Sequence, residues 1–256
     1  MVEDRKQNNM LKPCFEKGSI LKQHMLEALR DLPFTICDLF FNENGDGIIE
    51  GLKLTISDTN IMIGPGIFKY NGELFFFDHT STVPLKDNHN NFVYLVPSDK
   101  EIDGGTDVLI NIENFTEEQK DKFEIFRCTK GENAKISPYA TFMELLRITC
   151  NRLNQINTAF SYRGGSSLSR EYFKLYAYEI MQSNNASLRD LAFAMQCLNG
   201  INDISIVNNY FGISNEASSN IQIIEQMEIK LSNIDSNEKV ISNPKPTKNK
   251  GIIEID

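Results

Sequence analysis

Residues 67–77, with the sequence IFKYNGELFFF, decide the fold that we expect for the first half of the chain. Asn71 and Gly72 stand between two runs rich in apolar residues. Asn-Gly supplies the positive φ angles that a two-residue type I′ turn requires. The stretch therefore predicts a β-hairpin, with strands over 68–70 and 73–77.

The pattern of a sheet continues on both sides of this hairpin. Apolar residues before it are spaced mostly by two, as in half-buried strands; they are Ile49, Leu52, Leu54, Ile56, Ile61 and Ile63. Further short strands fit residues 92–96, 108–112 and 123–128, with turn residues between them. Short strands in this arrangement predict a small antiparallel β sandwich or barrel over residues 34–130.

The flanking regions have helical spacing instead. In the N-terminal segment 1–33, apolar residues predict a helix from Glu16 to Asp31 that ends before Pro33. After the β domain, helices are expected over four ranges: 137–160, 169–182, 187–200 and 215–234. Ser137-Pro138 and the Ser187–Asp190 capping box are favourable start signals. The chain is thus expected to be α+β, with a helical domain at 131–234 and a flexible tail at 235–256.

Composition and charge exclude several classes of protein. The chain has 256 residues, 41% of them hydrophobic, which is ordinary for a folded protein. With 26 basic and 35 acidic residues, the net charge of −9 repels phosphate backbones, so we expect no nucleic-acid partner. Residues 1–9 are polar, and the longest apolar runs fall far short of the ~20 residues of a membrane span. We expect synthesis in the cytoplasm without a signal peptide, and no membrane span.

No pattern of metal ligands or catalytic residues is present. Five cysteines are widely spaced and include no C-x-x-C pair, which predicts reduced, mostly buried thiols; they are Cys14, Cys37, Cys128, Cys150 and Cys197. The histidines His24, His79 and His89 are expected on a helix, a strand end and a loop. We therefore expect no catalytic residue, no cofactor and no metal site, and hence no enzyme.

One stretch, 42–53, resembles an EF-hand calcium loop at its centre, with oxygen-bearing residues at alternate positions and Gly47 at the sixth. Asn42 replaces the usual Asp at the first position, and Lys53 replaces the bidentate Glu at the twelfth. A calcium site and a simple turn into the first strand are the two interpretations, and the turn is favoured.

Two sets of apolar residues are candidates for contacts between subunits. Phe75 and Phe77 belong to a strand with neighbouring aromatic residues on both faces, which the domain core or a partner subunit must cover. Four residues have the 3-4-3 spacing of an oligomer seam: Ile224, Met227, Leu231 and Ile234. Residues 251–256, Gly-Ile-Ile-Glu-Ile-Asp, fit either a strand docked on a partner or a frayed segment.

Residues 32–129 resemble a β domain found in tail-fibre and baseplate proteins of bacteriophages and phage-derived particles. The segments that carry the resemblance are GDGIIEGLKL, beginning at Gly45, and IGPGIFKYNG, over 63–72. They are similar to the "GDGVISGLEV" strand and the "V-x-P-G-x-x-x-x-x-G" hairpin of those proteins. Residues 123–128, FEIFRC, are similar to the last strand of that domain.

The resemblance implies a structural component of the baseplate of a contractile phage tail or a phage-tail-like bacteriocin, as an adaptor between baseplate and tail fibre. The implied partners are other baseplate and tail-fibre proteins, and rotational symmetry implies a homo-oligomer. Such a particle is released from the cell by lysis.

Two other functions remain as alternatives. The β domain could bind a cell-surface saccharide such as a cell-wall polysaccharide, for which Tyr70, Phe77 and Tyr94 are candidates for an exposed aromatic platform. A polysaccharide-cleaving tail enzyme would instead require carboxylates clustered in a groove.

Overall fold

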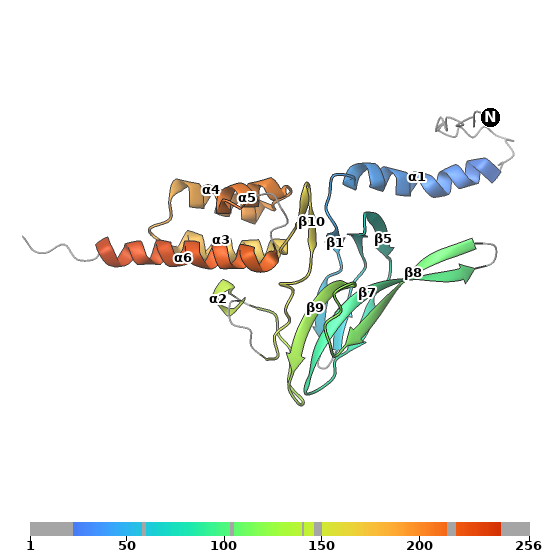
Figure 1. Cartoon of the computed structure of the whole chain (residues 1–256), viewed down its shortest axis with the longest axis horizontal. Helices are drawn as coiled ribbons and strands as arrows, with labels where there is room; N and C mark the ends of the chain where they lie inside the picture. The colour runs from blue at the N-terminus through green and yellow to red at the C-terminus, as the bar shows by residue number, and fades with distance from the viewer. Residues whose placement is uncertain are drawn as a thin grey trace, which may run out of the picture. The chain divides into compact units, whose positions relative to one another are not determined.

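The computed structural model describes residues 23–57, 60–102, 105–139, 141–145, 150–213 and 219–241. The chain divides into two compact units, Met1–Glu43 and Asn44–Asp256. The first contains helix α1, and the second contains the sheets followed by the remaining helices (Figure 1). The predicted α+β class is confirmed.

Helix α1 (Gln23–Phe41) continues through Pro33, so the predicted end before this proline is wrong. Pro33 lacks the N–H that would bond to the carbonyl of residue 29, which removes one hydrogen bond. Apolar residues nevertheless recur at helical spacing beyond it, and the helix continues to Phe41. Residues 34–41, expected at the start of the β domain, belong to this helix, and the start predicted at Glu16 lies outside the described residues.

The described strands form three sheets. Their bounds are β1 (Gly47–Gly51), β2 (Leu54–Ser57), β3 (Asn60–Ile63), β4 (Gly66–Tyr70), β5 (Glu73–Phe77), β6 (Ser81–Pro84), β7 (His89–Ile102), β8 (Gly105–Phe115), β9 (Phe123–Lys130), β10 (Phe160–Tyr162) and β11 (Gly165–Ser167). The strand orders are β11-β10-β1-β4-β5, β2-β3-β6 and β8-β7-β9. Strand pairs are antiparallel except for β1 and β10, which are parallel.

The predicted hairpin is confirmed as β4 and β5. Tyr70 pairs with Glu73, and the two turn residues have positive φ angles of 53° at Asn71 and 81° at Gly72. Asp46 accepts hydrogen bonds from the backbone N–H groups of both turn residues, at 2.8 and 3.0 Å. The side chain that precedes β1 therefore fixes the hairpin loop in place. The three later predicted strands are also confirmed, within β7, β8 and β9.

Five helices are described in the second unit: α2 (Phe142–Leu145), α3 (Arg170–Gln182), α4 (Leu188–Asn199), α5 (Ile204–Phe211) and α6 (Asn220–Ile241). The predicted starts of α3 and α4 are confirmed, with Ser169 and Ser187 as N-caps. The capping box between Ser187 and Asp190 is formed in both directions. Helix α5, capped by Asp203, was not predicted.

The helix predicted over 137–160 is wrong, because in the described part of this range only Phe142–Leu145 is helical. The segment that follows pairs with β9 instead. Arg127 and Asn154 exchange two backbone hydrogen bonds of 2.8 Å, and Ser137 bridges to Arg152. Backbone partners at the edge of the sheet outweigh the helical preference of the sequence, since each buried N–H and C=O group must be satisfied.

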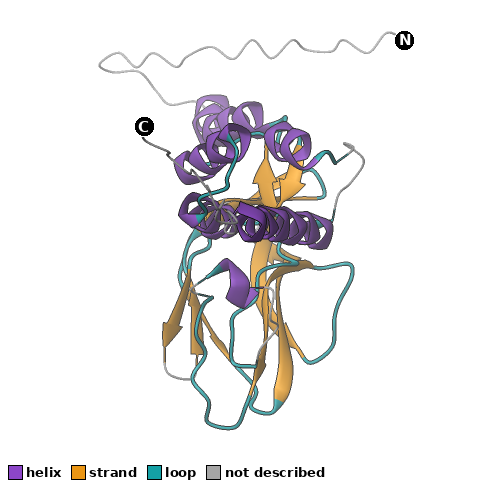
Figure 2. Ribbon diagram, turned by 90° about the vertical axis from the view of Figure 1, so that its left-hand side faces the viewer, coloured by secondary structure: helices purple, strands orange, loops and turns teal. Residues whose placement is uncertain are grey.

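Strands gather at one end of the second unit and helices at the other (Figure 2). Each group has its own hydrophobic core: one beneath the sheets, with Phe68 and Phe126 fully buried, and one among the helices, with Phe173 and Tyr176 fully buried. The pair β10–β11, which follows the predicted boundary at 130, joins the sheet of β1 (Figure 1). Phe160 packs against both cores.

Candidate interaction surfaces

Strand β5 holds two of the predicted interface residues. Phe77 is buried in the β core, and Phe75 is half-buried against it, where its ring stacks on Phe68 with centroids 5.3 Å apart. Phe76 points away from this core and is exposed. The domain core thus covers the face that carries Phe75 and Phe77, and the interface role predicted for them stays a prediction.

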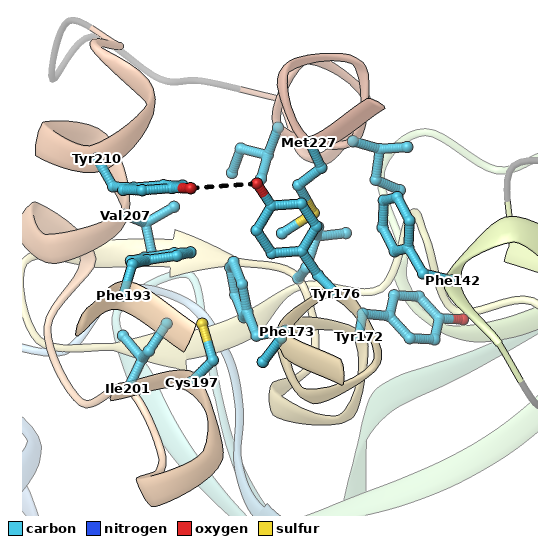
Figure 3. Packing of buried hydrophobic residues seen from close by; sticks show 14 of the residues in the cluster. Phe142, Tyr172, Phe173, Tyr176, Phe193, Cys197, Ile201, Val207, Tyr210 and Met227 are labelled. Carbon is cyan, nitrogen blue, oxygen red and sulfur yellow. Dashed lines mark hydrogen bonds between the residues drawn. The ribbon is translucent and has the colours of Figure 1, made fainter. Parts of the chain in front are cut away.

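Helix α6 holds the other four. Ile224, Met227 and Ile234 are buried in the helical core, and Leu231 is partly buried against it. Figure 3 shows Met227 close to the ring of Tyr176 of α3. These side chains therefore have an intramolecular role, which is to attach α6 to α3 and α5. The contact between subunits that the spacing predicts is not tested by this packing and stays a prediction.

A buried polar network joins three helices inside this core, and Figure 3 shows its contact between Tyr210 and Tyr176. Tyr210 of α5 donates a hydrogen bond of 2.7 Å to Asp190 of α4, and its hydroxyl lies 3.4 Å from that of Tyr176 of α3. The Tyr210 ring stacks on Phe193 with centroids 3.8 Å apart. Burial raises the pKa of Tyr210, and the hydrogen bonds to Tyr176 and Asp190 raise it further, so its hydroxyl stays protonated. Each polar atom of the network has a hydrogen-bond partner within the core, so the network stabilises the packing of the three helices.

The aromatic platform considered for saccharide binding is not formed by its candidate residues. Phe77 is 2% exposed and Tyr94 is fully buried, with its hydroxyl accepting a hydrogen bond from the Gln119 N–H. The Tyr70 hydroxyl donates to the carbonyl of Asp121, and its ring contacts Phe123 edge-on. Core packing takes up the faces that a sugar ring would need.

The stretch that resembles a calcium loop is a turn that leads into β1. Its central carboxylate, Asp46, binds the hairpin N–H groups described above, and the carbonyl of Asn44 accepts a hydrogen bond from Lys69. Among the described residues, no group of three or more His, Cys, Asp or Glu side chains is placed to hold a metal ion. The arrangement of these oxygen atoms is explained by strand pairing.

Thiols and imidazoles are dispersed. Cys128 and Cys197 are buried free thiols, and burial raises the pKa of each to about 12. Cys37 is half-buried and Cys150 is exposed, whereas Cys14 and the side chain of His24 lie outside the described residues. His79 contacts Asp78, and His89 contacts the carbonyl of Asp87. None of these contacts brings two histidines together.

A cavity of about 490 Å³ lies between strands β7 and β9 and helix α6. Its central cation, Arg127, forms ion pairs of 2.8 Å with Glu118 and 2.6 Å with Glu124, and it lies over the ring of Phe92. Burial lowers the pKa of Arg127, but the two carboxylates outweigh burial and raise it above the ordinary value. The charge is thus already neutralised within the chain.

A larger groove of about 750 Å³, which we call the strand-edge groove, was not evident from the sequence. One wall is nine consecutive residues, Ile48–Ile56, which include most of β1 and of the edge strand β2. The other wall comes from far along the chain: Pro138, Leu153, Gln155, Phe160–Tyr162, Ser169–Glu171 and Lys174. The sequence predicted the strands of the first wall, through the alternation of apolar residues after Gly47, but it gave no indication of the second wall.

The wall bends where two segments of the chain cross. Gly51 and Leu52 have positive φ angles of 78° and 49°. A Cβ atom at Gly66 would lie 2.4 Å from the backbone nitrogen of Leu52, so only glycine fits there. The bend separates β1 from β2 and leaves both facing the groove.

Helix α1 of the first unit carries large apolar side chains that its own unit does not cover. Six of them are exposed: Leu26, Leu29, Phe34, Ile36, Leu39 and Phe40, the last at 77%. Large exposed apolar side chains concentrated on one helix are typical of a protein–protein contact. Neither α1 nor any other helix of the described residues combines the length and the apolar character needed to cross a membrane.

No protein-family model matches this sequence, and no curated protein sequence matches it either. Among solved structures, the chain is similar to one chain of the TssK–TssF–TssG baseplate subcomplex of the type VI secretion system. The TM-score is 0.40 and the sequence identity 8%, over 87% of this chain and 99% of that chain. It is also similar to TssK in its crystal structure, with a TM-score of 0.31 and 10% identity, over 93% of this chain and 58% of that one.

Proposed function

We propose that this chain is a structural component of the baseplate of a contractile phage tail or a related tail-like particle, where it joins the baseplate to a tail fibre. It works by assembly and carries out no catalysis. Its neighbours are other baseplate and tail-fibre proteins and further copies of itself.

One observation carries the proposal: the residues of the phage-like motifs meet at one place in the fold. Gly51 and Gly66, from the two motif segments, pack backbone against backbone at the crossing of β1 and β4. Asp46, from the first segment, holds the turn of the second. The motif thus consists of residues that this sheet requires, which supports the proposal that the sheet is the shared element.

The exposed face of α1 supports the same proposal. Large apolar side chains in water carry a free-energy cost of about 25 cal/mol per Å² that burial against a partner removes. In an assembled baseplate, a neighbouring protein would be this partner and would cover the apolar side chains of α1. The acidic net charge of −9 agrees with protein rather than nucleic-acid neighbours.

Peptide mass spectrometry on purified tail-like particles tests this proposal, after prophage induction of the source strain. We expect this chain at a fixed molar ratio to the sheath and tube proteins. Its absence from intact particles would overturn the proposal.

Deleting the gene tests the adaptor role separately. We expect particles with sheath, tube and baseplate but without fibres in electron micrographs, and the native gene supplied in trans should restore the fibres. Particles that keep their fibres would contradict the adaptor role. Particles that fail to form a baseplate would place the chain in the baseplate itself.

A further inference from the structure

We propose that the strand-edge groove binds residues 251–256 of a second copy of this chain as an added β-strand. This goes beyond the proposed function and does not depend on it, since the contact is between two copies of one chain. The argument rests on the edge of β2, on the character of the groove and on the sequence of the segment.

Strand β2 has an open edge. Within the described residues it is hydrogen bonded on one side only, to β3, over the pairs from Leu54–Ile63 to Ser57–Asn60. In the part of the chain that the structure describes, β10 pairs with β1 at the single position Ile48–Phe160, so β1 is also open there beyond this point. A row of unpaired N–H and C=O groups is a template for another strand.

The groove beside this edge combines an apolar floor with a rim of three cations and two carboxylates. Leu54, Ile56 and Phe160 are half-buried and pack on the β core, and Leu153 is buried behind them. A volume of about 750 Å³ is in the range of ligand sites. The floor therefore offers pockets for apolar side chains on one face of a strand.

The charged residues that line the groove are the cations Lys53, Arg170 and Lys174 and the carboxylates Glu50 and Glu171. Arg170 lies 3.4 Å from Glu50, and Lys174 lies 2.8 Å from Glu171. Lys53 is exposed and forms no ion pair with the described residues. Its ammonium group is available to a carboxylate of an incoming strand.

Residues 251–256, Gly-Ile-Ile-Glu-Ile-Asp, have the complementary pattern. Side chains alternate between the two faces of a strand, so Ile253 and Ile255 share one face while Glu254 and Asp256 share the other. Ile253 and Ile255 match the apolar floor, whereas Ile252 lies on the face of the two carboxylates, one of which can pair with Lys53. In a chain with a net charge of −9, the ammonium group of Lys53 is the feature of this groove that would attract an acidic segment.

Geometry favours a segment from another copy. At its first residue, Asn220, α6 is hydrogen bonded to the carbonyls of Ile156 and Thr158, next to groove residues. Its 22 residues make it about 33 Å long, which carries residue 241 away from the groove. The nine residues before Gly251 span at most about 35 Å when fully extended. The chain's own segment would thus have to return along the whole helix without slack, a constraint that a second copy does not have.

If each copy gives its segment to one neighbour and receives that of another, the contacts are head to tail. Such contacts close into a ring when the rotation between copies permits, and otherwise continue as a filament.

Binding of the peptide Gly-Ile-Ile-Glu-Ile-Asp tests the groove. The receptor is the full chain with Ile253→Asp and Ile255→Asp, so that its own segment does not compete, and fluorescence anisotropy reports binding. We expect saturable binding that Lys53→Glu in the receptor weakens about fivefold, because it replaces an attraction by a repulsion. Lys120→Glu, an exposed lysine outside the groove, is the matched control and should leave the affinity unchanged.

Light scattering on the native chain tests the second copy. We expect the mean mass to rise with concentration, and Ile253→Asp with Ile255→Asp to abolish this rise. The proposal is overturned by absent peptide binding, by equal effects of Lys53→Glu and Lys120→Glu, or by association that survives the isoleucine substitutions. A native chain that stays monomeric, yet binds the peptide only after those substitutions, would show that its own segment occupies the groove and would also overturn the proposal.

Discussion

Helices α1 and α6 both carry apolar residues at helical spacing, but these residues are buried in α6 and largely exposed in α1. In α6 the residues at 3-4-3 spacing are Ile224, Met227, Leu231 and Ile234. In α1 a 4-3-4-3 spacing is formed by Met25, Leu29, Leu32, Ile36 and Leu39. Both patterns describe one apolar face on a helix of five or more turns.

The faces differ in what covers them. Met227 is fully buried against helices of its own chain, whereas Leu39 of α1 is 70% exposed. Spacing therefore predicts that a helix has a partner, but it does not tell whether the partner belongs to the same chain. The residues of the predicted subunit seam pack within the helical core, while a contact between subunits at this seam stays a prediction, and the helix near the N-terminus carries exposed apolar side chains.

The largest expected effect concerns the buried face. Met227→Ala removes a fully buried side chain from the helical core, and we expect it to lower the free energy of unfolding by about 2–5 kcal/mol. Urea denaturation followed by circular dichroism measures this change. Ile221→Ala, at an exposed position of the same helix, is the control and should cost less than about 0.5 kcal/mol. Equal effects of the two substitutions would contradict the assignment of this face to the core.

Local signals in the sequence predicted the parts of the fold that depend on neighbours in the chain. Asn71-Gly72 predicted the hairpin turn because the positive φ angles are a property of those two residues. Ser187 and Asp190 predicted the start of α4 because a capping box is completed within four residues. Such elements form in the structure as expected.

The predictions from the sequence failed where the local structure depends on contacts with residues far away in the chain. The segment after Ser137 has helical spacing, yet Asn154 bonds to Arg127 on β9 and Leu153 enters the β core. The second wall of the strand-edge groove is likewise formed by residues about 100 positions after the first. No pattern within a single segment contains this information, because it depends on how the β and helical regions pack together.

A second prediction concerns the polar network that fixes the helices against which α6 packs. Burial raises the pKa of Asp190, but hydrogen bonds from Ser187 and Tyr210 outweigh it, so its pKa lies below the ordinary value. The stabilisation is therefore complete above about pH 4, the pKa of the unfolded carboxyl, and is lost as the pH falls through the folded pKa. We expect Asp190→Asn to cost about 1–2 kcal/mol at pH 7 and less with falling pH.

Urea denaturation of both proteins between pH 3 and pH 7 measures this difference. Tyr210→Phe is a useful companion, because it keeps the ring stacked on Phe193 and removes only the hydroxyl that donates to Asp190. We expect it to cost about 1 kcal/mol at pH 7. A difference between native and Asp190→Asn proteins that stays constant over the whole range would contradict the role of the carboxylate.

The smallest expected effect on stability is also the sharpest test of the comparison. Leu29→Glu with Leu39→Glu places two charges on the exposed face of α1, where no core is disturbed, so the free energy of unfolding should change by less than about 0.5 kcal/mol. Incorporation into particles should fall strongly, because two carboxylates would have to be buried without partners in the contact with a neighbour. Mass spectrometry on particles purified from a strain with the altered gene measures this loss.

Gln23→Glu with Asp38→Asn, polar changes on the same helix, are the control and should leave incorporation intact. If the leucine variant were incorporated as well as the native chain, the exposed face of α1 would have no assembly role, and the difference between the two helices would lie in stability alone.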